Sequence, residues 1–131
     1  MVAQRPEQAL VLMLDAIPES VPKARKAVTA YAECCNGDCE RVALATSEAV
    51  TNVVVHAYDD EPGPLRVTAQ LVDSDLVVHV CDKGMGMRPD LDSPGMGMGL
   101  ALMASLTAAT SFSSLGPGTD VMMRFPCPSV D

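Results

Sequence analysis

Three short stretches of this 131-residue sequence combine residue types and spacings that can support chemistry. The first is Ser47-Glu48-Ala49-Val50-Thr51-Asn52. Because Glu48 and Asn52 stand four residues apart, a helix would place both on one face, and His56 would continue the same stripe. The amide oxygen of Asn52 suits a hard cation such as Mg²⁺, and the Glu48 carboxylate can orient or deprotonate a nucleophile. The pattern indicates a divalent-cation and base pair.

A second interpretation is that this pair has a structural role and binds no cation. A carboxylate and an amide among valines and alanines are costly to bury without partners, so Glu48 and Asn52 could cap or bridge neighbouring elements. A transition-metal site that includes His56 is disfavoured, because one imidazole, one carboxylate and one amide form an oxygen-rich set.

The second stretch, Asp82-Lys83-Gly84-Met85-Gly86-Met87, directly follows an apolar run. An aspartate at the end of a strand, followed by alternating glycines, fits a site where a flat ligand lies against the backbone. Asp82 would accept a hydrogen bond from an exocyclic amine, and Gly84 and Gly86 would leave the approach open. A glycine-rich turn capped by the aspartate explains the same pattern without a ligand.

The third stretch, Gly95-Met96-Gly97-Met98-Gly99-Leu100, leads into a predicted helix. Backbone N–H groups that precede a helix bind anions, so Gly95, Gly97 and Gly99 are candidates for phosphate contacts. The stretch is not a P-loop, since no Gly-Lys-Ser/Thr follows, and its glycine spacing differs from the dinucleotide fingerprint. A flexible loop without a ligand is the alternative interpretation.

Apolar periodicity and turn residues predict the elements that position these stretches. Ser20 is predicted to cap the first helix and Asp38 the second. Strand pairs joined by tight turns predict a mostly antiparallel sheet, and grouped helices predict one helical layer, which together make an α+β two-layer sandwich. The expected strands are Leu10–Leu14, Leu65–Val72, Leu76–Cys81, Thr107–Ser114 and Thr119–Phe125, and the expected helices are Val21–Cys35, Cys39–Tyr58 and Gly99–Leu106.

Length and composition exclude several classes of function. A chain of 131 residues is expected to form one domain, and its 9 Lys+Arg against 17 Asp+Glu would repel a nucleic-acid backbone. Two Tyr, two Phe and no Trp leave little for a base-stacking surface. No segment is predicted to be a signal peptide or a membrane span.

The five cysteines and the second histidine have ordinary interpretations. The cysteine count is odd and contains no C-x-x-C, which favours reduced thiols in a cytoplasmic protein over a zinc site on Cys34, Cys35 and Cys39. His79 alternates along a predicted strand, which favours a residue on a strand face over a catalyst.

Taken together and in this order, the three stretches resemble the N, G1 and G2 boxes of the GHKL ATPase superfamily, which includes gyrase, Hsp90, histidine kinases and MutL. The segment Ala45–Tyr58 closely resembles the N box of the small anti-sigma factor serine kinases of the RsbW/SpoIIAB type, and Gly116-Pro117-Gly118-Thr119 before a strand agrees with that branch. The resemblance covers residues 8–126 and implies a single ATP-binding domain with the histidine-kinase-type ATPase fold.

This resemblance implies a role for each matching residue. Asn52 would coordinate the Mg²⁺ that bridges the ATP phosphates, and Glu48 would be the general base for a protein serine hydroxyl. Asp82 would hydrogen-bond the adenine amino group, and Thr119 would add a polar contact near adenine. The glycines implied to lie against the base, the ribose and the phosphates are Gly84, Gly86, Gly95, Gly97 and Gly99.

The same resemblance implies a homodimeric anti-sigma factor that binds a sigma factor and phosphorylates a serine of a STAS-type anti-anti-sigma antagonist. One departure concerns the lid before the third stretch, where this family often carries an arginine that reaches the γ-phosphate. Here Pro89–Pro94 holds two acidic residues and no basic one. The alternative is therefore a regulatory module that binds ATP and partners without efficient phosphoryl transfer, and a domain that binds no nucleotide is the third hypothesis.

Overall fold

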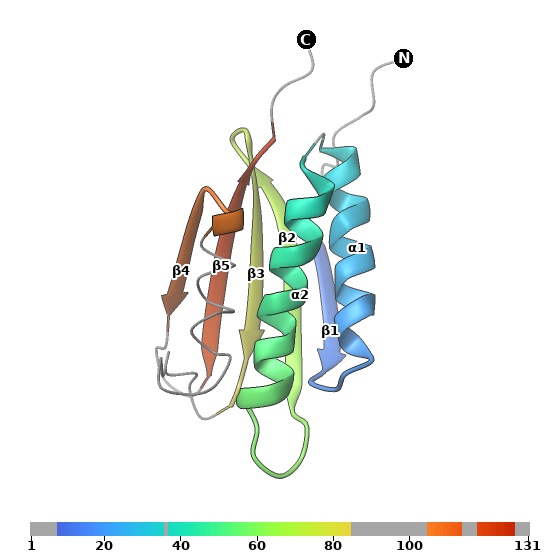
Figure 1. The fold of residues 1–131 in the computed structure, drawn as a ribbon, viewed down its shortest axis with the longest axis vertical. Coiled ribbons are helices and arrows are strands. Elements are labelled where there is room, and N and C mark those ends of the chain that lie inside the picture. The colour runs from blue at the N-terminus through green and yellow to red at the C-terminus, as the bar shows by residue number, and fades with distance from the viewer. Residues whose placement is uncertain (1–7, 36, 85–104, 114–117, 128–131) are drawn as a thin grey trace.

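The computed structural model describes residues 8–35, 37–84, 105–113 and 118–127. Their elements follow the predicted order, and Figure 1 shows how they are arranged. The predicted helix at 99–106 falls mostly outside the described residues. The observed elements are β1 (Leu10–Asp15), α1 (Ser20–Cys34), α2 (Cys39–His56), β2 (Pro64–Val72), β3 (Asp75–Asp82), β4 (Ala109–Ser113) and β5 (Thr119–Pro126).

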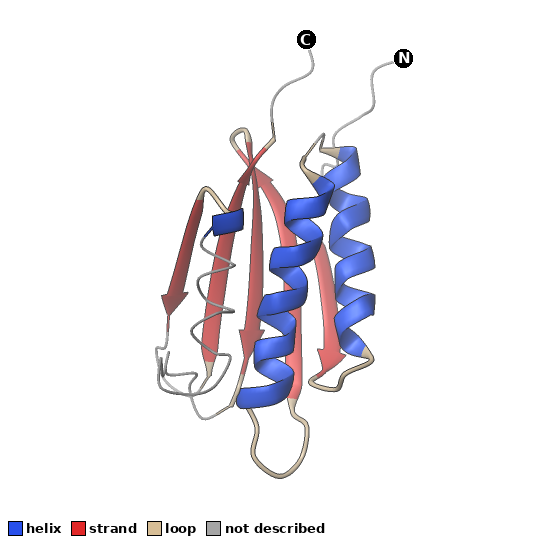
Figure 2. Cartoon of the chain, viewed as in Figure 1, coloured by secondary structure: helices blue, strands red, loops and turns tan. Residues whose placement is uncertain are grey.

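The strands form one sheet in the order β1-β2-β3-β5-β4, and every neighbouring pair is antiparallel. Both helices cover the same face of this sheet, as Figure 2 shows. The predicted α+β two-layer sandwich is therefore confirmed. The register pairs Asp82 at the end of β3 with Thr119 at the start of β5, so two candidate site residues meet at one end of the sheet.

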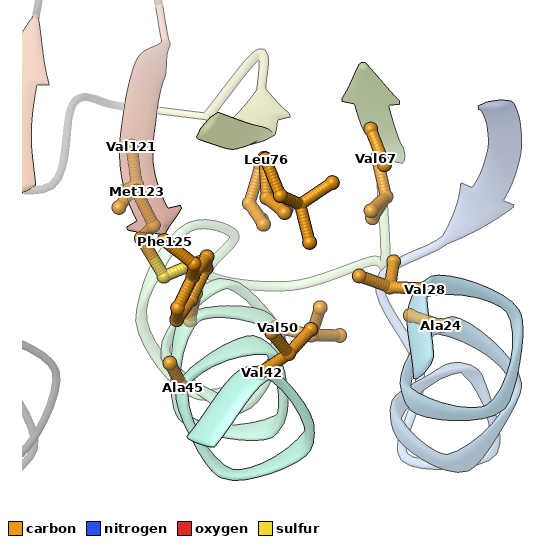
Figure 3. Packing of buried hydrophobic residues seen from close by; sticks show 14 of the residues in the cluster. Ala24, Val28, Val42, Ala45, Val50, Val67, Leu76, Val121, Met123 and Phe125 are labelled. Carbon is orange, nitrogen blue, oxygen red and sulfur yellow. The ribbon is translucent and has the colours of Figure 1, made fainter. Parts of the chain in front are cut away.

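The core lies between the helices and the sheet (Figure 3). Alternation in β2, β3 and β5 turns every second side chain towards the helices, and the largest buried side chains, Leu65, Leu76, Met123 and Phe125, come from these strands. The helices contribute smaller residues, which lets α2 lie close to the sheet. The fully buried apolar residues of α2 are Val42, Ala45, Ala49, Val50 and Val53.

Of the two predicted helix caps, one is confirmed and one is wrong. Asp38 caps α2, because its Oδ1 accepts a hydrogen bond from the Arg41 N–H at 3.2 Å. Ser20 is instead the first residue of α1, and Glu19 occupies the cap without a side-chain hydrogen bond. The Ser20 hydroxyl donates to the Asp15 carbonyl oxygen at 2.6 Å, so it fastens the start of α1 to the end of β1.

None of the five cysteines, all of which lie within the described residues, forms a disulfide bond. In the same part of the chain, no His, Cys, Asp and Glu side chains gather in a group of three or more that could hold a metal ion. No helix there is long and apolar enough to cross a membrane.

Candidate functional site

The candidate site lies where α2, β3 and β5 come together at one end of the sheet. In Figure 1 the C-terminal end of α2 lies beside the end of β3. The backbones approach closely there, since a Cβ on Gly84 would stand 2.0 Å from the Ala57 carbonyl oxygen. The fold therefore brings the helix that carries Glu48 and Asn52 to the strand end that carries Asp82.

Asp82 is the most distinctive group at this end. Its side chain is buried, with the residue 6% exposed, and Oδ1 accepts a hydrogen bond from the Gly84 N–H at 2.9 Å. The other oxygen, Oδ2, has no partner among the described residues. Burial raises the pKa of Asp82, against the opposing effect of the Gly84 and Thr119 backbone N–H groups. A carboxylate with one oxygen held and the other without a partner in the described part of the chain fits an acceptor for a ligand's amine.

Two glycines allow the backbone to close around Asp82. Gly118 has a φ of +105°, and a Cβ there would stand 2.0 Å from the Asp82 carbonyl oxygen. Gly84, predicted to leave room for a flat ligand, has a further role, because its missing side chain lets the end of β3 approach Ala57. Thr119, which follows Gly118, is 4% exposed and pairs with Asp82 in the sheet register.

Asn52 and Glu48 lie on α2 with different exposure. Asn52 is 6% exposed, and its Nδ2 has no hydrogen-bond partner among the described residues. Protein contacts there leave this donor unsatisfied, which fits a ligand that brings its own oxygens, as a phosphate does. Glu48, one turn earlier, is only half-buried, so its carboxylate is accessible to a reacting group.

Asn52 also fits a magnesium ion that is coordinated mainly by the phosphates of a bound ligand. Magnesium usually keeps several waters and takes one or two protein oxygens plus phosphate oxygens. The Asn52 side chain supplies an amide oxygen of the hard type, and no acidic cluster competes for the cation among the described residues. Asn52 would hold the ion from the protein side, and the phosphates would supply further oxygens.

Tyr58 is a further component of the site, which sequence reasoning placed only at the end of the N-box-like segment. Its hydroxyl donates to the Pro64 carbonyl oxygen at 2.5 Å and accepts from the Lys83 N–H at 2.9 Å. Burial raises the pKa of Tyr58, the Lys83 N–H opposes this, and the nearby Asp82 adds to it. Only the three-dimensional structure reveals this set of contacts.

His79 lies on a strand face, as predicted. It alternates on β3 with Val78 and Val80, which belong to the core, so its side chain is on the face of the sheet away from the helices. Its Nδ1 lies 2.9 and 3.1 Å from the two carboxylate oxygens of Asp120 on β5. His79 therefore does not join the site around Asp82.

Four of the predicted glycines, Gly86, Gly95, Gly97 and Gly99, lie outside the described residues. The same holds for the lid segment 89–94. Their roles remain predictions from the sequence.

Comparison with known proteins gives related sequences over most of the chain. Residues 14–125 match the family described as the histidine kinase-like ATPase domain. The anti-sigma F factor of Clostridium acetobutylicum is 30% identical over 100 residues, which covers 66% of this chain and 69% of that protein. The anti-sigma F factor of Caldanaerobacter subterraneus subsp. tengcongensis is 32% identical over 115 residues, covering 77% and 80%.

Solved structures show the same fold. A chain with the RsbU and RsbW domains of a Mycobacterium tuberculosis protein has a TM-score of 0.72 at 24% identity, covering 95% of this chain and 34% of that one. The histidine kinase domain of the blue-light activated histidine kinase from Erythrobacter litoralis EL346 has a TM-score of 0.58 at 28% identity, covering 68% and 44%. This chain thus spans less than half of either solved chain.

Proposed function

Since this chain belongs to the histidine kinase-like ATPase domain family, we propose that it binds Mg-ATP and acts as an anti-sigma factor with serine kinase activity. The proposed ATP-binding domain spans residues 8–126. The observation that carries the nucleotide proposal is the buried Asp82, whose Oδ2 is left without a partner among the described residues. A buried acceptor of this kind is stabilised when a ligand donates to it, as the adenine amino group would.

The proposed site uses residues from both layers of the fold. Asp82 and Thr119 would bind the adenine end, and Asn52 on α2 would hold Mg²⁺ at the phosphate end. The ion would neutralise phosphate charge and orient the triphosphate. The proposed backbone cradle for the base, ribose and phosphates consists of Gly84, Gly86, Gly95, Gly97 and Gly99.

Glu48 is the proposed general base of phosphoryl transfer. A partner's serine oxygen would form a bond to the γ-phosphorus while the bond from that phosphorus to the β–γ bridging oxygen breaks and ADP leaves. The serine proton would pass to the Glu48 carboxylate. Its half-buried position supports this role, because a protein substrate must reach the side chain from outside.

The proposed partners follow from the relatives. Proteins with 30% and 32% identity to this chain are anti-sigma F factors, which supports binding of a sigma factor. We further propose a STAS-type anti-anti-sigma antagonist as the phosphorylation substrate, a homodimer as the assembly and the cytoplasm as the location. With a net charge of -8, the surface would attract a basic partner, and binding to it would weaken as salt increases.

Label transfer tests the kinase proposal directly. The protein is incubated with γ-labelled Mg-ATP and a candidate antagonist, beside Glu48→Gln, which keeps the shape of the side chain but cannot accept the proton. Label on the antagonist with the wild type and at least about a hundredfold less with Glu48→Gln is expected. No label with either protein would remove the kinase claim, whereas equal labelling by both would remove Glu48 as the general base.

A regulatory module without efficient phosphoryl transfer is the second candidate, favoured by the two acidic residues and missing arginine of Pro89–Pro94. Calorimetry with Mg-ATP and Mg-ADP separates the cases. Binding without label transfer identifies the module, whereas absence of binding to both nucleotides overturns both proposals.

A further inference from the structure

Tyr58 connects three segments around Asp82 through one side chain. It lies two residues beyond the end of α2, its hydroxyl donates to Pro64 at the start of β2, and it accepts from Lys83 directly after β3. The phenol oxygen thus both donates and accepts, with donor–acceptor distances of 2.5 and 2.9 Å. Few single side chains can fix one helix end and two strand ends at once.

The ring of Tyr58 is held as firmly as its hydroxyl. A Cβ on Gly63 would stand 2.2 Å from Cε1 of the ring, so the aromatic face packs on bare backbone. The Gly63 carbonyl oxygen in turn accepts a hydrogen bond from the Ala16 N–H at 2.9 Å. The ring therefore packs against the Gly63 backbone while its hydroxyl oxygen accepts the hydrogen bond from Lys83.

The segment held by Tyr58 is the one that shapes the Asp82 carboxylate. Lys83 donates its backbone N–H to the Tyr58 hydroxyl oxygen, and the next residue, Gly84, donates its N–H to Asp82 Oδ1 at 2.9 Å. Gly84 also lies against Ala57, which precedes Tyr58 in the chain. Any movement of the Lys83 backbone is passed to Gly84 and so to the hydrogen bond that orients Asp82.

We infer that Tyr58 is a positioning residue for nucleotide binding, which holds the end of α2 and the Lys83–Gly84 turn so that Asp82 faces the adenine amino group. This inference rests on the proposed function, because it assigns a role within the same nucleotide site. Tyr58 acts through Lys83 and Gly84 and does not itself contact the nucleotide. Loss of its hydroxyl is expected to weaken ADP binding about fivefold, the typical effect of one net hydrogen bond.

The other tyrosine of the chain provides a matched control. The Tyr31 hydroxyl donates to the Gln8 carbonyl oxygen at 3.2 Å, which links α1 to the segment that precedes β1, away from Asp82. Tyr31→Phe and Tyr58→Phe each remove one hydroxyl and keep one ring. A difference in ADP affinity between the two variants therefore results from where the hydroxyl lies and not from the loss of a hydroxyl as such.

The first measurement is ADP affinity by calorimetry for the wild type, Tyr31→Phe and Tyr58→Phe. About fivefold weaker binding by Tyr58→Phe alone is expected. Equal affinity for Tyr58→Phe and the wild type overturns the inference and leaves the proposed function intact. Absence of ADP binding by the wild type overturns the proposed function, and the inference with it.

The second measurement uses tyrosine fluorescence, because the chain has two tyrosines and no tryptophan. In Tyr31→Phe, all tyrosine emission comes from Tyr58, and it should change with ADP at the concentration that calorimetry gives for binding. Tyr58→Phe corrects for light absorbed by ADP, since its emission comes from Tyr31. A Tyr58 emission that stays constant while ADP binds, combined with a lowered melting temperature alone, would show a purely structural role.

Discussion

Two aspartates on neighbouring strands of the sheet have opposite surroundings. Asp82 on β3 pairs with Thr119, and Asp120 on β5 pairs with Cys81, so the two lie one register step apart and on opposite faces. Asp82 is 6% exposed and keeps Oδ2 unpaired among the described residues. The Asp120 side chain is 41% exposed, and its carboxylate contacts His79 Nδ1 and the Cys81 thiol.

This difference indicates that Asp82 is arranged to bind a ligand, whereas Asp120 has a structural role at the protein surface. An unpaired buried acceptor costs roughly 1–3 kcal/mol, whereas a partly exposed carboxylate with protein partners costs little. The fold tolerates the cost at Asp82 at the end where α2 and β3 meet. Asp120 lies on the face of the sheet away from the helices, here called the open face, and bears no such cost.

The largest expected effect comes from adding a side chain at Gly84, where the helix layer and the sheet approach each other closely. In Gly84→Ala, the new Cβ would stand 2.0 Å from the backbone oxygen of Ala57, which a side-chain movement cannot relieve. We expect a loss of about 3 kcal/mol in the free energy of unfolding and loss of ADP binding. Urea unfolding and calorimetry measure both.

The control for this prediction is Gly37→Ala at the other end of α2. There the nearest atom to a new Cβ is the Cys127 Sγ at 3.3 Å, and the Gly37 backbone is not in the left-handed region. We expect a loss below about 1 kcal/mol and unchanged ADP affinity. Similar unfolding midpoints for the two variants would contradict the close approach of Gly84 to α2.

The second prediction removes the charge of each aspartate in a separate variant. Asp82→Asn removes a buried charged acceptor from the proposed adenine contact, so ADP affinity should fall about thirtyfold, the effect of a hydrogen bond to a charged group. Asp120→Asn, on the open face, should leave ADP affinity within about twofold. Comparable losses in both variants, measured by calorimetry, would mean that the two faces are not independent.

The sequence predicts the fold well because apolar periodicity and turn residues carry the information locally. Two β-rich runs at 65–72 and 76–81, joined by a short turn, predicted the central hairpin, and the position of Asp38 before a helix predicted its capping hydrogen bond. The predicted cap at Ser20 is wrong, because its hydroxyl donates to the Asp15 carbonyl oxygen and does not accept from the helix. That acceptor becomes available only when β1 and α1 pack together.

The candidate site is predictable only in part, for a similar reason. Asp82 and Asn52 are polar residues in apolar surroundings, which the sequence itself displays. The Tyr58 contacts join residues up to 25 positions apart, and the His79–Asp120 pair spans 41, so neither leaves a local pattern. Such long-range pairs depend on strand register and on where a helix ends.

The third prediction concerns pH and sharpens the difference between the aspartates. Burial raises the pKa of Asp82 above its unfolded value, so the folded state holds this proton more tightly. Between the unfolded pKa and the raised folded pKa, the folded protein binds more protons, and its stability falls as pH rises through that window. Below the window the carboxyl is neutral in both states and has no such effect.

Asp82→Asn removes this dependence, because an amide does not titrate. The variant should therefore be more stable relative to the wild type at pH 7 than at pH 3.5. Urea unfolding at the two pH values measures the difference, with Asp120→Asn as the reference. A relative stability that is the same at both pH values would show that the Asp82 carboxyl is not destabilised by burial.

The smallest expected effect belongs to His79 on the open face. The His79 and Asp120 side chains are 38% and 41% exposed, and ion pairs at such positions contribute little because water screens them. Glutamine can still donate to Asp120, so His79→Gln should change the unfolding free energy by less than about 0.5 kcal/mol and leave ADP affinity unchanged. A weakening of ADP binding close to that of Asp82→Asn would place the open face in contact with the site through β3. In that case full pairing of a polar group would no longer distinguish a structural role from a functional one in this sheet.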